Sequence, residues 1–100
     1  MSLDLNIVIV TTSPYTMNKN DTVFFINRST PSSVILPSLS NEDCGKSFYI
    51  KDYSGTSGTN PITITAPSSK KINGVAFAML NGNYSHLQVV YDGTNWMIIA

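Results

Sequence analysis

Few residues in this chain have side chains suited to catalysis. The single cysteine, Cys44, and the single histidine, His86, lie far apart in the sequence. No Gly-x-Ser-x-Gly motif, which would mark a nucleophilic serine, accompanies them. Glu42 and Asp43 are adjacent, so in a turn they point apart rather than share a proton as paired catalytic carboxylates do. The sequence therefore predicts a protein that is not an enzyme and has no catalytic residues.

Sites for metals and cofactors are also not indicated. One histidine and one cysteine do not make up the ligand set of a zinc site, and Asp52–Gly55 lacks the dense oxygen ligands of a calcium loop. The glycine pair in Gly55–Gly58 is not followed by the lysine of a phosphate-binding loop. We therefore expect no metal site and no cofactor.

Surface recognition is the remaining chemistry, and four residues near turns are candidates for it. Tyrosine rings stack on sugars or anchor protein contacts at little entropic cost. Tyr53 leads into the long loop 54–61, and Tyr84 follows a turn rich in asparagine. Loops on a rigid β-scaffold are the usual place for binding residues. The predicted recognition residues are Tyr53, Asn60, Asn81 and Tyr84, whereas Trp96 is expected to pack in the core.

The elements that must position these residues are short strands. No segment repeats apolar residues at the helical period, whereas runs of Val, Ile, Phe, Tyr and Thr recur between turn residues every 8–12 residues or so. Asp92-Gly93 lies between two apolar runs and predicts a hairpin. Residues 39–43 could form one helical turn capped by Ser38 or Ser40. The predicted strands are 6–11, 22–27, 33–36, 46–52, 62–65, 76–80, 85–91 and 96–99.

About eight short strands at this spacing predict an all-β fold, an antiparallel β-sandwich of jelly-roll-like or β-prism-like type. One hundred residues correspond to one domain, covering 1–100. We expect this domain to be the C-terminal tip of a longer protein, with residues 1–4 as a linker or an added remnant.

Two of the strands are apolar on both faces. Ile7–Val10 and Val23–Ile26 do not alternate with polar residues, unlike Ile62–Thr65. A second apolar face left exposed usually marks an interface. The sequence therefore predicts a contact between subunits that contains Ile7, Ile9, Phe24 and Phe25. The alternative is a curled sheet that buries both faces within one subunit.

The charge composition limits the classes of partner. Six basic and six acidic residues give no net charge, and charged residues form 12% of the chain, against about 25% in ordinary soluble domains. A surface so poor in charge is typical of a domain partly covered by neighbours. There is no basic stripe, so we expect no nucleic acid partner. Apolar runs stay below the ~18 residues that span a membrane, so we expect no membrane insertion.

Several segments together resemble a viral family. They are Gly45–Gly55, Asn60–Thr65, Ile72–Gly74 and the terminal hairpin Leu87–Ala100. Over roughly residues 5 to 100 the chain is similar to the small C-terminal β-domain of bacteriophage tail fibres and spikes, and of appendage proteins of large DNA viruses and virophages. That family commonly has Ile-Asp-Gly where this chain has Ile72-Asn73-Gly74, and asparagine suits the same turn.

The resemblance implies a homotrimer in the virion. The expected function is that of a viral structural and attachment module: a trimeric head of a fibre, spike or capsid-associated protein. Its expected partners are a host-surface glycan or protein and other virion proteins. Two alternatives stay open: a cellular lectin-like carbohydrate-binding module, and a small jelly-roll capsid or cement protein without receptor activity.

Overall fold

The computed structural model describes residues 6–100, and within them the chain is almost entirely β-structure. The predicted all-β class is therefore confirmed, and the expectation for residues 1–4 lies outside the described residues. The strands are β1 (Ile7–Val10), β2 (Tyr15–Thr16), β3 (Val23–Ile26), β4 (Ser32–Ile35), β5 (Ser47–Asp52), β6 (Ile62–Thr65), β7 (Phe77–Leu80), β8 (His86–Tyr91) and β9 (Trp96–Ile98), with one 3-10 turn at Asn41–Asp43.

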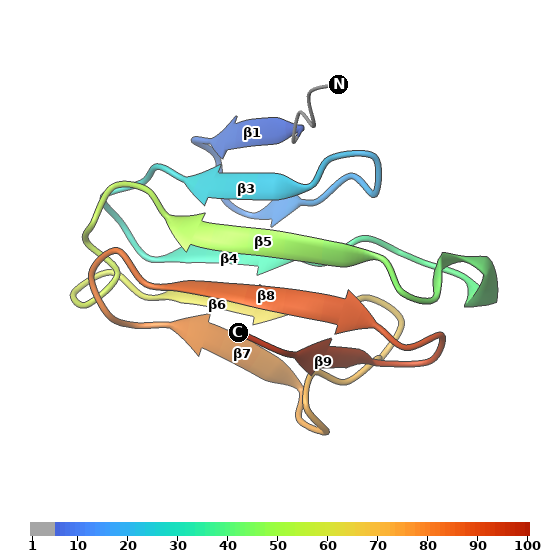
Figure 1. Ribbon diagram of the computed structural model, residues 1–100. Helices are drawn as coiled ribbons and strands as arrows, with labels where there is room; N and C mark the ends of the chain where they lie inside the picture. The colour runs from blue at the N-terminus through green and yellow to red at the C-terminus, as the bar shows by residue number, and fades with distance from the viewer. Residues whose placement is uncertain (1–5) are drawn as a thin grey trace.

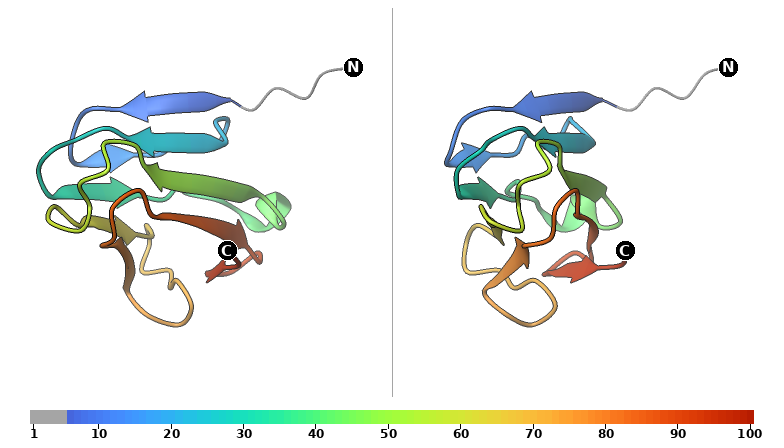
Figure 2. Two further views of the ribbon diagram at one scale, coloured as in Figure 1. Left: turned by 60° about the vertical axis from the view of Figure 1, so that its left-hand side comes forward. Right: turned by 90° about the vertical axis from the view of Figure 1, so that its left-hand side faces the viewer.

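The strands form two sheets in two layers (Figures 1 and 2). The front sheet has the order β1-β3-β5-β8-β9, and the back sheet has the order β2-β4-β6-β7. From β1 to β6 the chain alternates between the sheets, so that β1–β2, β3–β4 and β5–β6 are three coils stacked on one another. β7 then pairs with β6 in the back sheet, the chain crosses once more to the front sheet, and β8 and β9 form a hairpin there.

Strand direction differs from the sequence-based expectation. The pairs β1–β3 and β3–β5 in the front sheet are parallel, as are β2–β4 and β4–β6 in the back sheet. The expectation of an antiparallel arrangement is thus wrong for the N-terminal half. It holds for β5–β8, β6–β7 and β8–β9. Each coil crosses to the other sheet before it returns, so consecutive strands of one sheet run the same way.

All eight predicted strands are present, with small differences at their ends. The hairpin around Asp92-Gly93 is confirmed, and Gly93 has the positive φ of 99° that this loop requires. The 3-10 turn follows Ser40, which the sequence indicated as a cap. Only β2 was not predicted, because its two residues are too few to show an alternating pattern.

The core lies between the sheets and consists of alternate residues of the strands together with Leu36 and Ile72 from the connections. Its largest fully buried side chains are Trp96, Phe24, Phe48, Ile26, Leu36, Ile50, Ile64 and Ile72. No helix within residues 6–100 is long and apolar enough to span a membrane.

Candidate functional site

Four connections gather at one end of the two sheets, which we call the loop end. They are residues 11–14, 27–31, 53–61 and 81–85, which follow β1, β3, β5 and β7 at the left of Figure 1. They lie together because the coils stack in register. The remaining connections, 17–22, 36–46, 66–76 and 92–95, lie at the opposite end. The predicted recognition residues all belong to the loop end.

A buried carboxylate organises the loop end. Asp52, the last residue of β5, is only 1% exposed. Its Oδ1 accepts hydrogen bonds from the Gly55 amide at 3.0 Å and the Ser54 hydroxyl at 3.2 Å. Its Oδ2 accepts from the amides of Ser57 and Tyr84, each at 2.9 Å. One side chain therefore holds both the 53–61 loop and the 81–85 loop.

The hydrogen bonds keep this carboxylate ionised. Burial acts to raise the pKa of Asp52, but the hydrogen bonds donated by Ser57, Tyr84 and Gly55 outweigh it and lower the pKa to about 2. Asp52 is thus an anion at neutral pH with its oxygens turned inward. Its role is to shape the loops rather than to contact a ligand.

Further hydrogen bonds join these loops to each other and to a third loop. The Ser57 hydroxyl donates to the Gly82 carbonyl, and the Gly58 amide donates to Asn83 Oδ1 at 2.9 Å. The Ser54 hydroxyl donates to the Arg28 carbonyl at 2.7 Å. The loop end is therefore a connected structure and presents its side chains in fixed positions.

Tyr84 is one of the exposed side chains held in this way. Its backbone has a φ of +60°, in the left-handed region that non-glycine residues seldom adopt. The Lys51 ammonium donates to its carbonyl oxygen, and Lys51 Nζ lies 5.8 Å from the centre of its ring. The ring rests on the backbone of Gly55, where an added Cβ would lie 2.3 Å from Cζ.

The contact with Tyr84 predicts the result of a Gly55→Ala substitution. Gly55 has a φ of +78°, and the added methyl group would also overlap the Tyr84 ring. We expect the free energy of unfolding to fall by about 1–2 kcal/mol through backbone strain, with a smaller further loss because the exposed Tyr84 ring must move aside. Urea unfolding measures the loss. Gly45→Ala is the matched control, because Gly45 has a φ of +95° but open space around it. Equal losses in the two variants would contradict the packing role.

Tyr53 is the second exposed tyrosine of the loop end. Its amide donates to the Ile26 carbonyl at 3.0 Å. Its ring stacks on Phe25, with 5.2 Å between ring centres and 20° between planes. Because β5 and β8 pair so that Lys51 lies opposite His86, the residues Tyr53 and Tyr84 extend from neighbouring strand ends. The structure thus brings two of the predicted recognition residues into one region.

The two predicted asparagines contribute less to this region. Asn60 is half-buried, and its amide donates to the Thr56 carbonyl at 2.8 Å. Asn81 is exposed at the end of β7.

Sequence reasoning missed Asp52 and Lys51. An aspartate that ends a strand before Ser and Gly residues is a local signal for a turn held by its side chain, but the contacts of Lys51 depend on the pairing of β5 with β8.

The outer face of the front sheet adjoins the loop end. Ile7 and Ile9 project from this face and are 54% and 53% exposed, whereas Phe25 beside them is half-buried. Phe24 was predicted to belong with them, and here the prediction is wrong. Its side chain lies on the opposite face of β3, wholly within the core between Tyr15 and Phe48.

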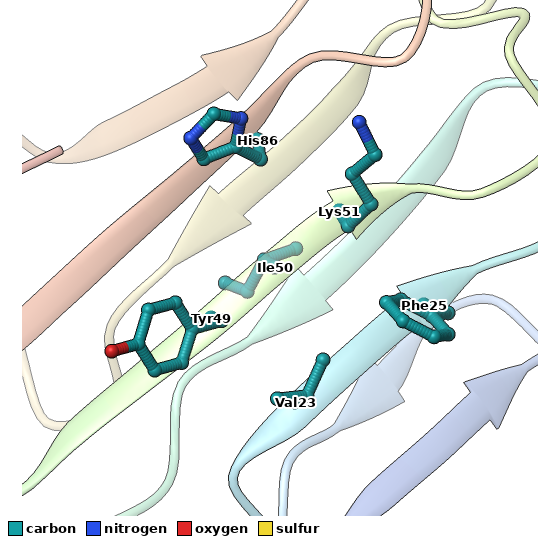
Figure 3. A pocket seen from close by; sticks show the side chains of 6 residues that line it. All are labelled: Val23, Phe25, Tyr49, Ile50, Lys51 and His86. Atoms are coloured by element: carbon teal, nitrogen blue, oxygen red, sulfur yellow. The ribbon is translucent and has the colours of Figure 1, made fainter.

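A shallow hollow of about 260 Å³ lies on the same outer face (Figure 3). It is lined by Val23, Phe25, Tyr49, Ile50, Lys51 and His86. One row of the strand register runs across β1, β3, β5 and β8 through Ile9, Phe25, Lys51 and His86. The exposed apolar edge and the polar residues of the hollow therefore belong to one continuous surface.

Comparison of the sequence with models of known protein families finds no match, and comparison with curated proteins finds no significant one.

Proposed function

We propose that this chain is a non-enzymatic viral attachment module, the trimeric head of a fibre, spike or capsid-associated protein. The observation that carries the proposal is the apolar outer face of the front sheet at β1, where Ile7 and Ile9 are more than half exposed. The resemblance to viral fibre tips supplies the virion as its location. The loop end would meet the host surface or a virion partner.

Assembly would cover this apolar face and so stabilise the protein. Burying a side chain such as isoleucine is worth about 1.5–3 kcal/mol. The face continues from Ile7 and Ile9 to the half-buried Phe25 without a charged residue between them. A closed ring of three subunits would cover it with a different surface of the next subunit.

The loop end supports a recognition role. Ordering flexible loops on binding costs free energy, and a loop that is already ordered avoids this cost. The hydrogen bonds to Asp52 and Arg28 order the loop end before any ligand arrives. A jelly-roll cement protein is less favoured, because jelly rolls pair their strands antiparallel and both sheets here contain parallel pairs.

Light scattering on a size-exclusion column tests the assembly. We expect a mass of three times 10.9 kDa at all concentrations. Ile9→Asp is expected to reduce the mass to that of one chain while circular dichroism stays unchanged. In the trimer each buried, unpaired charge would cost several kcal/mol, but in the monomer the aspartate would face water.

Met79→Asp is the matched control for this prediction. Met79 is also an exposed apolar residue on an edge strand, 42% exposed on β7 of the back sheet. The Met79→Asp variant should keep the mass of three chains. A trimer that persists in Ile9→Asp would show that β1 is not at the contact. A wild-type monomer that binds glycans would instead favour the lectin-like alternative.

A further inference from the structure

The charges of the described residues are divided unequally between the two ends of the molecule. The carboxylates of Asp21, Glu42, Asp43 and Asp92 all lie in connections at the end opposite the loop end. There Lys19 pairs with Asp43 at 3.8 Å. At the loop end, the only carboxylate within residues 6–100 is Asp52, which is buried. Lys51 and Arg28 are thus the charged groups that a ligand would meet there.

Both of these cations are bonded to neutral oxygens. Arg28 donates to the carbonyl of Thr11 and to the hydroxyls of Thr30 and Ser32. Lys51 donates to the carbonyl of Tyr84. An ammonium group has three donors, so Lys51 can make further hydrogen bonds. The electrostatic character of the loop end therefore favours an anionic ligand.

Aromatic rings flank the lysine. The Tyr53 ring is fixed by stacking on Phe25, and the Tyr84 ring is fixed on Gly55. The side chains of Lys51 and His86 project from neighbouring strands on the same face as Phe25 (Figure 3). The imidazole of His86 can donate or accept a hydrogen bond. A cation, a polar ring and two exposed tyrosine side chains thus lie close together at the loop end.

We propose that the surface formed by Lys51, Tyr53, Tyr84 and His86 binds a carboxylated sugar. The sugar carboxylate would accept hydrogen bonds from the Lys51 ammonium, and charge-assisted bonds of this kind are the stronger ones. The apolar face of the sugar ring would stack on a tyrosine, and its hydroxyl groups would meet His86. This assignment rests on the proposed attachment function and names the class of its ligand.

A titration of the full chain with D-glucuronate, followed by amide NMR signals, tests the assignment. Neutral D-glucose is the matched ligand without the carboxylate. With glucuronate in the millimolar range we expect saturable shifts of the amide signals of Lys51, Tyr53, Tyr84 and His86. The affinity for glucose should be weaker by a factor of about ten or more. Lys51→Gln should weaken glucuronate binding about tenfold, because it removes one charge-assisted bond.

Two variants control for indirect effects. Lys51→Arg keeps the charge and should retain binding, and Lys46→Gln removes a lysine at the opposite end of β5 and should change nothing. Acetate, which has the carboxylate but no sugar ring, is the second comparison ligand. The carboxylated sugar would be overturned as the ligand if glucose or acetate bound as tightly as glucuronate, or if Lys46→Gln weakened binding as much as Lys51→Gln. The absence of shifts at the four residues would overturn it as well.

The mass of the same samples separates this inference from the proposed assembly. A trimer that shows no shifts with glucuronate would refute the sugar site and leave the trimeric head standing. A monomer that binds glucuronate through Lys51 would support the sugar site and refute the trimer.

Discussion

Replacing Asp52 with alanine is expected to lower the free energy of unfolding by about 3–5 kcal/mol. Three donors lose their acceptor, the amides of Gly55, Ser57 and Tyr84, whereas the hydroxyl of Ser54 keeps the Arg28 carbonyl. An unsatisfied buried donor costs about 1–3 kcal/mol. Water can reach some of these amides once the loops loosen, so the total should lie below the sum of the three.

Urea unfolding of the wild type and the variant measures this loss. Asp92→Ala is the matched control, because Asp92 accepts from the amides of Thr94 and Asn95 at 2.8 and 2.7 Å but is exposed. Water can replace an exposed acceptor, so we expect Asp92→Ala to cost much less than Asp52→Ala. Similar losses in the two variants would mean that the burial of Asp52 does not increase the contribution of its hydrogen bonds to the free energy of unfolding.

The same comparison predicts a dependence on pH. The pKa of Asp52 is lowered from 3.8 to about 2 in the folded chain. A carboxyl group with a lowered pKa adds stability above its unfolded pKa, and this stability is lost as the pH falls through the folded pKa. The difference in unfolding free energy between wild type and Asp52→Ala should thus be constant above about pH 5 and shrink between about pH 4 and pH 2. A constant difference down to pH 2 would contradict the lowered pKa.

Replacing Trp96 with alanine is expected to cost about 3–5 kcal/mol. The ring is fully buried and packs against Phe48 and Tyr91, with ring centres 5.7 and 5.1 Å apart. Its removal leaves a cavity that the surrounding strands cannot close without breaking their pairing. For a domain of this size the loss is a large part of a total stability of about 5–15 kcal/mol.

Circular dichroism during urea unfolding is the suitable measurement, because Trp96 is the only tryptophan and its fluorescence is lost in the variant. Met97→Ala is the control, since Met97 follows Trp96 in β9 and points to the outer face. We expect it to stay within about 0.5–1 kcal/mol of the wild type. A small loss in Trp96→Ala would mean that the hairpin packs loosely on the core.

Local sequence predicted the strands well where the alternation was clear. In Ile62–Thr65 the isoleucines are buried and the threonines are half-buried, as the pattern indicated. In Val23–Ile26 both faces are apolar, so the pattern could not tell which phenylalanine points inward. The core decides this, because β3 lies between β1 and β5 with Phe24 facing the back sheet.

The candidate site was predicted in part. Tyr53 and Tyr84 could be identified because each is an aromatic residue beside a turn. The contacts of Lys51 and the link from Asp52 to the 81–85 loop could not, because their partner Tyr84 lies more than 30 residues away in sequence. The pairing of β5 with β8 brings these partners together, and no local pattern specifies that pairing.

The sequence by itself determined the all-β class, the positions of eight strands and the terminal hairpin, because these depend on the alternation and turn preferences of neighbouring residues. Only the tertiary structure decided the parallel stacking of the coils, the inward direction of Phe24 and the joining of two loops by Asp52. These features arise from contacts between segments distant in sequence. The free energy of such contacts depends on how the whole chain packs.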